Sequence, residues 1–558
     1  MTPLPADSSH AAPPLRIYNT LARRIEPLVV SDPANVTFYT CGPTVYDDAH
    51  IGNFRSFLAA DVLRRWVESP LSTVTTRDGR THTAPGGRRV THVMNITDVG
   101  HMTDDAEGGE HGEDRMVVAG RRIAEAKKSG KLPAGTEIDP ANPWQIARFY
   151  EDRFKDDARR LGLKVAIEAQ NDPTLMPRAT ESIDGMKALI ARLISRGHAY
   201  AVGATGSRVV YFDVRSFEPY GRLSGNTLDA LKEGEGGRIS VENQAGKKHP
   251  ADFLLWKEDS THIMKWDSPW GAGYPGWHIE CSVMSASRLR ATGGKPLDAE
   301  ALAALTVENG DAVIDVHSGG EDNIFPHHEC EIAQSCCAFN AAPEQGSFSA
   351  MWFHPRFLMV EGDKMSKSKG NFFTARDLFA APHNIEPGAL RLELIKTHYR
   401  TNANFTMQGL KDSQRTVERW RRFLELAGAP ASAHGAPSRV EQAFAAAMSE
   451  DLNIAGAIGE LNKWIGETPS PTPADARSLL NIDAVLGVLS LERPQAAQTS
   501  IGVFIGCDAD PAVLAKLEER LAARKAKDFA ASDRIRDELA EMGYAIKDVA
   551  GGKVEVRK

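Results

Sequence analysis

The sequence has no run of about 18 apolar residues, which is the length that a membrane-spanning helix requires. Its first fourteen residues, MTPLPADSSHAAPP, contain neither the basic start nor the apolar stretch of a secretory leader. We therefore expect a cytoplasmic protein with no membrane partner. Cysteine is also scarce, with 6 in 558 residues. This scarcity disfavours a disulfide framework and raises the question of metal binding.

The chain has no excess of basic residues, because 66 lysines and arginines face 74 aspartates and glutamates, for a formal net charge of -8. A polyanionic partner such as RNA would therefore have to bind a local basic face. The composition, 42% hydrophobic and 25% charged, is that of an ordinary globular protein and excludes wholesale disorder or a rod. At about 150 residues per domain, the length predicts three to four domains.

The hydrophobic pattern predicts a Rossmann-like α/β catalytic domain in two halves. Residues 35–40 (NVTFYT) alternate as a strand does, apolar residues from Phe54 onward keep helical spacing, and residues 89–96 (RVTHVMNI) are typical of a second buried strand. Such a βαβ unit places nucleotide chemistry at the carboxyl edge of a parallel sheet. Strand-like patterns resume at residues 251–256 and 312–316, after a stretch rich in glycine and charge that we interpret as an insertion.

The prediction for the whole chain is an α/β protein in seven segments. They are a flexible N-terminal tail at 1–30, the first half of the catalytic domain at 31–160, a connective insertion at 161–250, the second half of the catalytic domain at 251–350, a signature-loop region at 351–400, a helical bundle at 401–495 and a small C-terminal domain at 500–558. The bundle is predicted from helical spacing that continues almost without interruption, and the last segment from two charged helices and a short strand.

One helix carries a candidate pair of metal ligands. In FPHHECEIAQ, Pro326 suits a first helical turn, so His327 and Glu331 would lie four residues apart on one face. Cys41, at the end of the first strand, and Cys281, in GWHIECSVM, are candidates for the remaining ligands, since zinc takes nitrogen, sulfur and carboxylate ligands. From these residues alone, a hydrogen-bonded pair beside two buried thiols is the commoner arrangement.

Two further motifs suit the binding of phosphate groups. His50, Ile51, Gly52 and Asn53 stand where the loop after the first strand enters its helix, and Gly52 would let a nucleotide approach the backbone closely. The run KMSKSKGN at 364–371 is a polar loop with lysines, which suits folding over a triphosphate. Either motif alone is also typical of a solvated loop, but the two together favour phosphate binding.

In order along the chain, CGPTVYDDAHIGN, SPWGAGYPGWHIECSVM, FPHHECEIAQ and KMSKSKGN resemble the class I aminoacyl-tRNA synthetases, and among them the cysteinyl-tRNA synthetase family. The segments NITDVGHMTDDA, ALRLELIKTHYR and RKAKDFAASDRIRDEL extend this resemblance from about Tyr39 to the C-terminus. It implies a class I catalytic sheet with an insertion, a helical bundle on the anticodon side and a C-terminal anticodon-binding domain. It also implies a reaction in which ATP, with Mg²⁺, activates L-cysteine to cysteinyl-adenylate before transfer to the 3′ end of tRNA(Cys).

The resemblance implies roles for individual residues. One zinc ion per chain would be bound by Cys41, Cys281, His327 and Glu331. A zinc–thiolate bond would separate cysteine from serine, a near isostere that an apolar pocket discriminates poorly. The implied catalytic residues are His50, Asn53, Lys364 and Lys367; the implied ATP contacts are these four with Gly52 and Ser366; and the implied cysteine pocket is Gly42, Thr44, Thr97, Trp277 and His317. Asn53 stands where the family often has a second histidine, so an uncharged amide would make that phosphate contact.

Candidate tRNA contacts are basic residues on the predicted helices of the C-terminal third. They are Arg415, Arg419, Arg421 and Arg422 on one helix and Arg524, Lys525 and Lys527 near the end. For any one of them, an ordinary solvated helix surface is the alternative interpretation. The last strand lacks the tryptophan expected in the family. Nothing in the sequence requires a dimer, and we expect a monomer.

Two other functions remain open at this point. A zinc-dependent ligase that joins cysteine to the amine of a glucosaminyl-inositol would share the adenylation chemistry, but its small acceptor would not require the residues beyond Gly428. A non-catalytic RNA-binding paralogue would keep the fold, but the presence of His50 and both signature lysines argues against it.

Overall fold

The computed structural model describes residues 13–102, 112–133, 135–228, 246–289, 297–307, 312–341, 348–365, 370–432, 436–493, 496–498, 501–505, 509–549 and 553–557. Within these ranges, no helix is both long enough and apolar enough to span a membrane.

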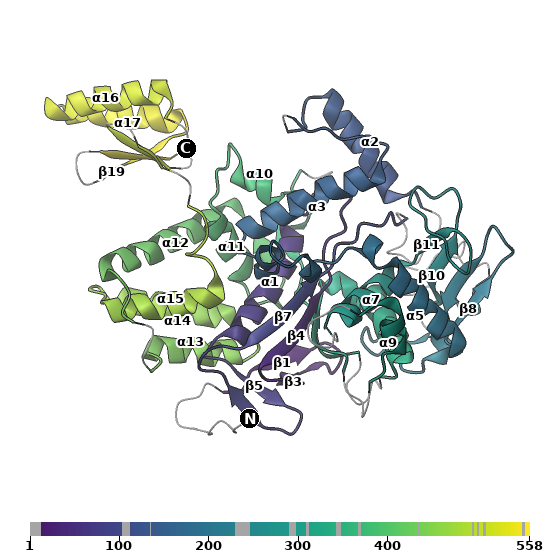
Figure 1. Cartoon of the computed structure of the whole chain (residues 1–558). Helices are drawn as coiled ribbons and strands as arrows, with labels where there is room; N and C mark the ends of the chain where they lie inside the picture. Colours follow the sequence, from purple (N-terminus) through teal and green to yellow (C-terminus); the bar gives the residue numbers. More distant parts are fainter. Residues whose placement is uncertain are drawn as a thin grey trace.

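A four-stranded parallel sheet in the order β13-β12-β4-β7 forms the centre of the catalytic region (Figure 1). β4 (Asn35–Thr40) and β7 (Arg89–Met94) come from its first half, and β12 (Ile314–Ser318) and β13 (Ser349–Phe353) from its second. The connection from β4 to β7 contains α1 (Ile51–Glu68). The prediction of one parallel sheet assembled from two distant parts of the chain is therefore confirmed.

Successive residues of β4 point to opposite faces of the sheet, as the geometry of a strand requires. Phe38 belongs to the hydrophobic core that contains the apolar residues of α1. Tyr39 belongs to a second core, which contains Cys281 and other residues of α7 (Trp277–Leu289). Helices on both faces leave the carboxyl edge of the strands as the place where functional side chains gather.

The insertion forms its own antiparallel sheet in the order β11-β10-β9-β8. Its strands are β8 (Ala199–Val202), β9 (Val209–Phe212), β10 (Phe253–Glu258) and β11 (Gly273–Pro275). The expectation that residues 251–256 belong to the resumed catalytic sheet is wrong, because β10 pairs with β9 and β11. An apolar run shows that a strand is buried but does not identify its partners.

The N-terminal segment differs from the expected flexible tail where the structure describes it. β1 (Arg16–Asn19) and β2 (Arg24–Pro27) form an antiparallel hairpin, and β3 (Val29–Val30) pairs with β5 (Thr73–Thr76), which also pairs with β6 (Thr81–Thr83). The leucines and isoleucine at positions 15, 17 and 28 are fully buried in the main core. Residues 1–12 of the expected tail lie outside the described residues.

The C-terminal third contains a helical bundle and a separate small domain. The bundle comprises α11 (Pro387–Ile395), α12 (Met407–Ala427), α13 (Arg439–Ser449), α14 (Ile454–Glu467) and α15 (Pro473–Leu486). The end domain packs α16 (Pro511–Lys525) and α17 (Phe529–Glu541) on a sheet of β17 (Ala496–Gln498), β18 (Gly502–Ile505), β20 (Val554–Arg557) and β19 (Ala545–Asp548). It has its own core, and Figure 1 shows it as a lobe beyond the bundle.

The remaining elements surround the catalytic sheet or connect it to the bundle. They are α2 (Arg115–Lys128), α3 (Pro143–Arg160), α4 (Lys164–Glu168), α5 (Ile183–Ser195), α8 (Ala299–Ala304), α9 (Glu329–Phe339), β14 (Leu358–Val360), β15 (Asp363–Lys364), α10 (Ala375–Phe379) and β16 (Ala403–Phe405).

A buried arginine joins α1 to the bundle. Arg391 on α11 donates to Asp61 Oδ2 on α1 over 2.6 Å and to the carbonyl of Leu486, at the end of α15, over 2.7 Å. It also donates to the carbonyl of Leu161, just after α3, over 2.9 Å. Because its side chain is fully buried, these bonds replace all of its hydration.

Candidate active site and metal centre

Four side chains that could bind one metal ion converge beside the carboxyl end of β4. Cys41 directly follows β4, Cys281 lies on α7, and His327 and Glu331 lie just before and within α9. Cys41 Sγ is 3.8 Å from Cys281 Sγ, 3.5 Å from His327 Nε2 and 3.6 Å from Glu331 Oε1. Tetrahedral zinc with bonds of about 2.0–2.3 Å spaces its ligand atoms by roughly 3.3–3.8 Å. The four residues, all buried, therefore fit such an ion.

His327 and Glu331 lie on one helical run that begins at Pro326. Phe325, directly before it, is extended (φ -138°, ψ 134°), whereas His328 already has helical dihedral angles where the run continues into α9. The expected first helical turn at Pro326 is therefore present. His327 Nε2 lies 3.0 Å from Glu331 Oε1, so the expected pairing of the two side chains occurs.

The charges of this cluster are strongly coupled. Burial alone would raise the pKa of Glu331, but His317 and His327 lower it to about 2. Burial alone would lower the pKa of His327, but Glu331 and Cys281 raise it to about 10. Burial and the neighbouring Cys281 raise the pKa of Cys41. A bound dication would take the place of the protons on His327 and Cys41, which is how metal binding normally couples to ligand protonation.

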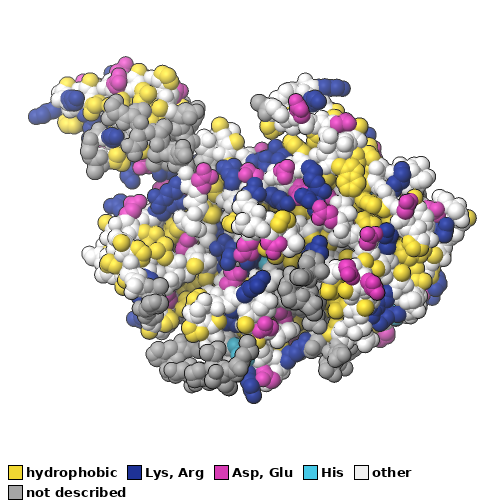
Figure 2. Space-filling model, in the orientation of Figure 1, with side chains coloured by type: hydrophobic (Ala, Val, Ile, Leu, Met, Phe, Trp, Pro, Cys, Tyr) yellow, Lys and Arg dark blue, Asp and Glu magenta, His cyan; other side chains and the backbone are white. Residues whose placement is uncertain are grey.

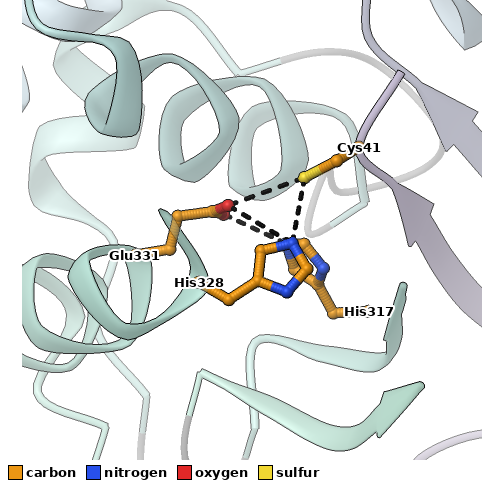
Figure 3. A group of neighbouring side chains, drawn as sticks. All are labelled: Cys41, His317, His328 and Glu331. Carbon is orange, nitrogen blue, oxygen red and sulfur yellow. Dashed lines mark hydrogen bonds and ion pairs between the residues drawn. The ribbon is translucent and has the colours of Figure 1, made fainter. Parts of the chain in front are cut away.

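Two further histidines touch the same cluster (Figure 3). His328 Nε2 lies 3.2 Å from Cys41 Sγ, and His317 Nε2 lies 3.0 Å from Glu331 Oε2. Together with Cys41 and Glu331 they form a second set of ligand atoms within 4.8 Å of one another. Sequence spacing did not identify His328, because the residue four positions later is Ile332, which cannot bind a metal. The contact of His328 is instead with Cys41, which follows β4.

The residues implied for the cysteine pocket border this cluster. Trp277 stacks on the ring of His327, with centroids 4.3 Å apart, and His317 contacts Glu331. Thr44 and Thr97 form a backbone bridge. Gly42 is required by a close approach, since a Cβ atom there would lie 1.8 Å from the carbonyl oxygen of Asn95. Trp277 and His317 thus contact the cluster directly, Gly42 adjoins Cys41 in the chain, and Thr44 is joined to Thr97.

Glu280 is a candidate functional residue that the sequence analysis missed. It is fully buried on α7 beside Cys281, and its Oε1 lies 2.8 Å from His101 Nε2. Its Oε2 accepts a hydrogen bond from the Thr97 hydroxyl over 3.4 Å. Burial raises the pKa of this carboxyl group, although His101 opposes the shift. A carboxylate next to a candidate metal ligand within an apolar helix was the available signal.

The two phosphate motifs meet at the start of α1. His50 is the N-cap residue, its Nδ1 accepts from the Asn53 backbone N–H over 3.1 Å, and Asn53 Oδ1 accepts from the His50 backbone N–H over 3.1 Å. A Cβ atom on Gly52 would lie 3.0 Å from Met365 Cε, so the second motif packs directly against the first. Lys364 is exposed on β15. Ser366 and Lys367 lie outside the described residues.

The candidate tRNA contacts are exposed, with one correction. Arg415, Arg419 and Arg422 are exposed on α12, as are Arg524, Lys525 and Lys527 at the end of α16. Arg421 is instead buried and forms an ion pair with Glu386 over 2.7 Å, because it lies on the inward face of α12. Among the described residues on the face in Figure 2, basic and acidic side chains are interspersed, as the net charge suggests.

Comparison with known proteins identifies the family. Residues 27–415 match the family described as tRNA synthetases class I (C) catalytic domain, and residues 508–557 match the cysteinyl-tRNA ligase anticodon binding domain. The cysteine–tRNA ligase of Salinibacter ruber is 37% identical over 97% of this chain and 98% of its own length. Those of Nitrobacter hamburgensis and Acidiphilium cryptum are each 38% identical, over 97% and 96% of this chain and 98% of each relative. The chain belongs to the cysteinyl-tRNA synthetase family of class I aminoacyl-tRNA synthetases.

Proposed function

We propose that the chain is a cysteine–tRNA ligase in which a zinc ion selects the thiolate of the substrate. The observation that carries the proposal is the convergence of Cys41, Cys281, His327 and Glu331, all buried and with ligand atoms within 4.8 Å of one another, beside the carboxyl edge of a class I sheet. A bound zinc ion would supply a thiophilic site that favours the deprotonated form of cysteine and disfavours a serine hydroxyl. The residues around it would position the amino acid.

Each part of the pocket has a distinct task in this proposal. The close approach of Gly42 to the Asn95 carbonyl fixes the backbone beside Cys41, and Trp277 closes the pocket over His327. His317 holds Glu331 through its second carboxylate oxygen and contacts the substrate. The bridge between Thr44 and Thr97 fixes the two loops that form the entrance.

The start of α1 would bind the triphosphate of Mg-ATP. A helix N-terminus favours negative charge, and His50 at the N-cap would stabilise the charge that develops on the α-phosphate as the carboxylate of cysteine displaces pyrophosphate. The oxygen of Asn53 is occupied in the capping box, so its side-chain amide N–H would be the donor toward phosphate. Contact between Gly52 and Met365 supports closure of the loop with Lys364, Ser366 and Lys367 over the same phosphates.

The terminal adenosine of tRNA(Cys) would then take the cysteinyl group from the adenylate. The bundle and the C-terminal domain would bind the anticodon side of the tRNA through the exposed arginines of α12 and the basic end of α16. We propose that the enzyme acts as a monomer in the cytoplasm, the compartment of translation.

Pyrophosphate exchange with and without a tRNA(Cys) transcript tests the proposal. We expect cysteine-dependent exchange without tRNA, and cysteinylation of the transcript when it is added. Exchange without any charging, together with consumption of a glucosaminyl-inositol acceptor, would favour the small-acceptor ligase. No exchange with zinc-loaded protein would favour the non-catalytic paralogue.

A further inference from the structure

A row of hydrogen-bonding side chains leads from the metal cluster to the N-terminal hairpin. Beyond the contact between His328 Nε2 and Cys41 Sγ, His328 Nδ1 lies 2.7 Å from His354 Nε2. His354 Nδ1 lies in turn 2.7 Å from Thr20 Oγ1, in the turn between β1 and β2. The two histidines are buried and Thr20 is half-buried. Neither His354 nor Thr20 has a role in the proposed function.

The direction of these hydrogen bonds follows from the state of Cys41, and this step rests on the proposed function. A cysteine bound to zinc is a thiolate, which can accept a hydrogen bond but has no proton to donate. His328 Nε2 must then carry the N–H. A neutral imidazole has one N–H and one lone pair, so His328 Nδ1 accepts from His354 Nε2, and His354 Nδ1 accepts from the Thr20 hydroxyl.

Each imidazole is buried and has a partner for both of its ring nitrogens, which matches the one donor and one acceptor of the neutral form. Burial lowers the pKa of His354 to about 3. The hydroxyl of Thr20 can donate or accept, so it can end the row in the required direction.

We propose that Thr20, His354 and His328 are positioning residues that keep a proton on His328 Nε2 and thereby donate a hydrogen bond to the Cys41 thiolate. This donation orients Cys41 and stabilises its deprotonated form, which is the form that binds a metal, so that zinc is held more tightly. Partners of this kind commonly alter metal affinity or activity by about 10- to 100-fold.

The competing interpretation makes His328 a direct ligand in the set Cys41, His317, His328 and Glu331. Its Nε2 lies 3.9 Å from Glu331 Oε1, within reach of a shared ion. Glutamine and leucine at position 328 separate the two roles. The amide of glutamine can replace the N–H that donates to sulfur but is a poor replacement for an imidazole ligand, and leucine can do neither.

The test measures the zinc dissociation constant of the full-length protein by chelator competition. Thr20→Val removes only the far end of the row, Thr20→Ser restores the hydroxyl, and Thr91→Val is a matched control. Thr91 is also half-buried and donates to Asn35 Oδ1 over 2.9 Å, away from the cluster. We expect Thr20→Val to bind zinc about 10-fold more weakly, with Thr20→Ser and Thr91→Val close to the unmodified chain. The thiolate-to-metal charge-transfer band of the cobalt-substituted protein should shift in Thr20→Val alone.

Equal zinc affinity and an unshifted cobalt band in Thr20→Val and Thr91→Val would overturn the proposal. His328→Gln should retain zinc and His328→Leu should weaken it; loss of zinc from both would make His328 a ligand and also overturn it. Cys281→Ser distinguishes this failure from that of the proposed function. If Cys281→Ser keeps its zinc, the proposed ligand set is wrong. If Cys281→Ser loses its zinc but Thr20→Val has no effect, the ligand set stands and only the roles proposed for Thr20, His354 and His328 are refuted.

Discussion

Replacing Arg391 by methionine should destabilise the junction between α1 and the helical bundle. The substitution keeps an unbranched side chain of similar length but removes the guanidinium group, with its bonds to Asp61, Leu161 and Leu486. Asp61 is itself buried. Burial alone would raise its pKa, but Arg65 and Arg391 hold the pKa below its usual value, so Asp61 is a buried carboxylate at neutral pH.

The expected cost follows from the loss of one partner of a buried ion pair, which is about 3–5 kcal/mol. The lower end of this range, about 3 kcal/mol, applies here because Arg65 Nε remains 2.6 Å from Asp61 Oδ2. The exposed Arg80 is the matched control. It pairs with Asp78 at the surface, so Arg80→Met should change stability by less than about 0.5 kcal/mol.

Native-state hydrogen exchange at the amides of α1, α11 and α15 is the appropriate assay, because a chain with several domains does not unfold in one step. The free energy of local opening should fall in Arg391→Met and not in Arg80→Met. The double variant Asp61→Asn with Arg391→Met should lose less than the sum of the single variants, by at least about 1 kcal/mol. Additive losses, or a loss below about 0.5 kcal/mol in Arg391→Met, would refute the reasoning.

Three further outcomes are expected. Lys367→Ala should lower the rate of cysteine activation by about 100-fold without changing cysteine affinity, because its contact forms mainly in the transition state; unchanged exchange kinetics would remove it from the mechanism. Cys281→Ser should lose both zinc and cysteine binding, as measured by metal analysis and calorimetry, because a hydroxyl does not replace a thiolate ligand. A chain ending at residue 495 should keep pyrophosphate exchange but lose most tRNA charging. Exchange should survive because the end domain has its own core and its Arg557 pairs with Glu418 only through partly exposed side chains. Full charging by the shortened chain would deny the end domain a role in tRNA binding.

The strands and helices near the active site were predictable because their periodicity is strong. The strand expected at residues 35–40 is β4 with the same bounds, and the run from Phe54 lies within α1. The partners of a strand were less predictable, because they depend on contacts between distant segments. The pairing of β10 within the insertion and the burial of the N-terminal hairpin are two such cases.

The candidate metal ligands were found as a helical pair and two scattered cysteines, and only the resemblance to a family joined them. Spacing along one helix could not find His328, His354 or Thr20, because each reaches the cluster from a different element or through a neighbour. For Arg421, the sequence predicted a functional role that the structure does not support. Its charge suggested a place at the tRNA surface, but its position on α12 places it in an internal ion pair.

The most direct test of the account compares cysteine-dependent and serine-dependent pyrophosphate exchange in zinc-loaded and zinc-stripped protein. We expect strong exchange with cysteine in the loaded protein, background exchange with serine, and loss of the cysteine signal on stripping that zinc restores. Comparable exchange with serine, or cysteine-dependent exchange that persists without zinc, would contradict the selection of the substrate thiolate by the metal.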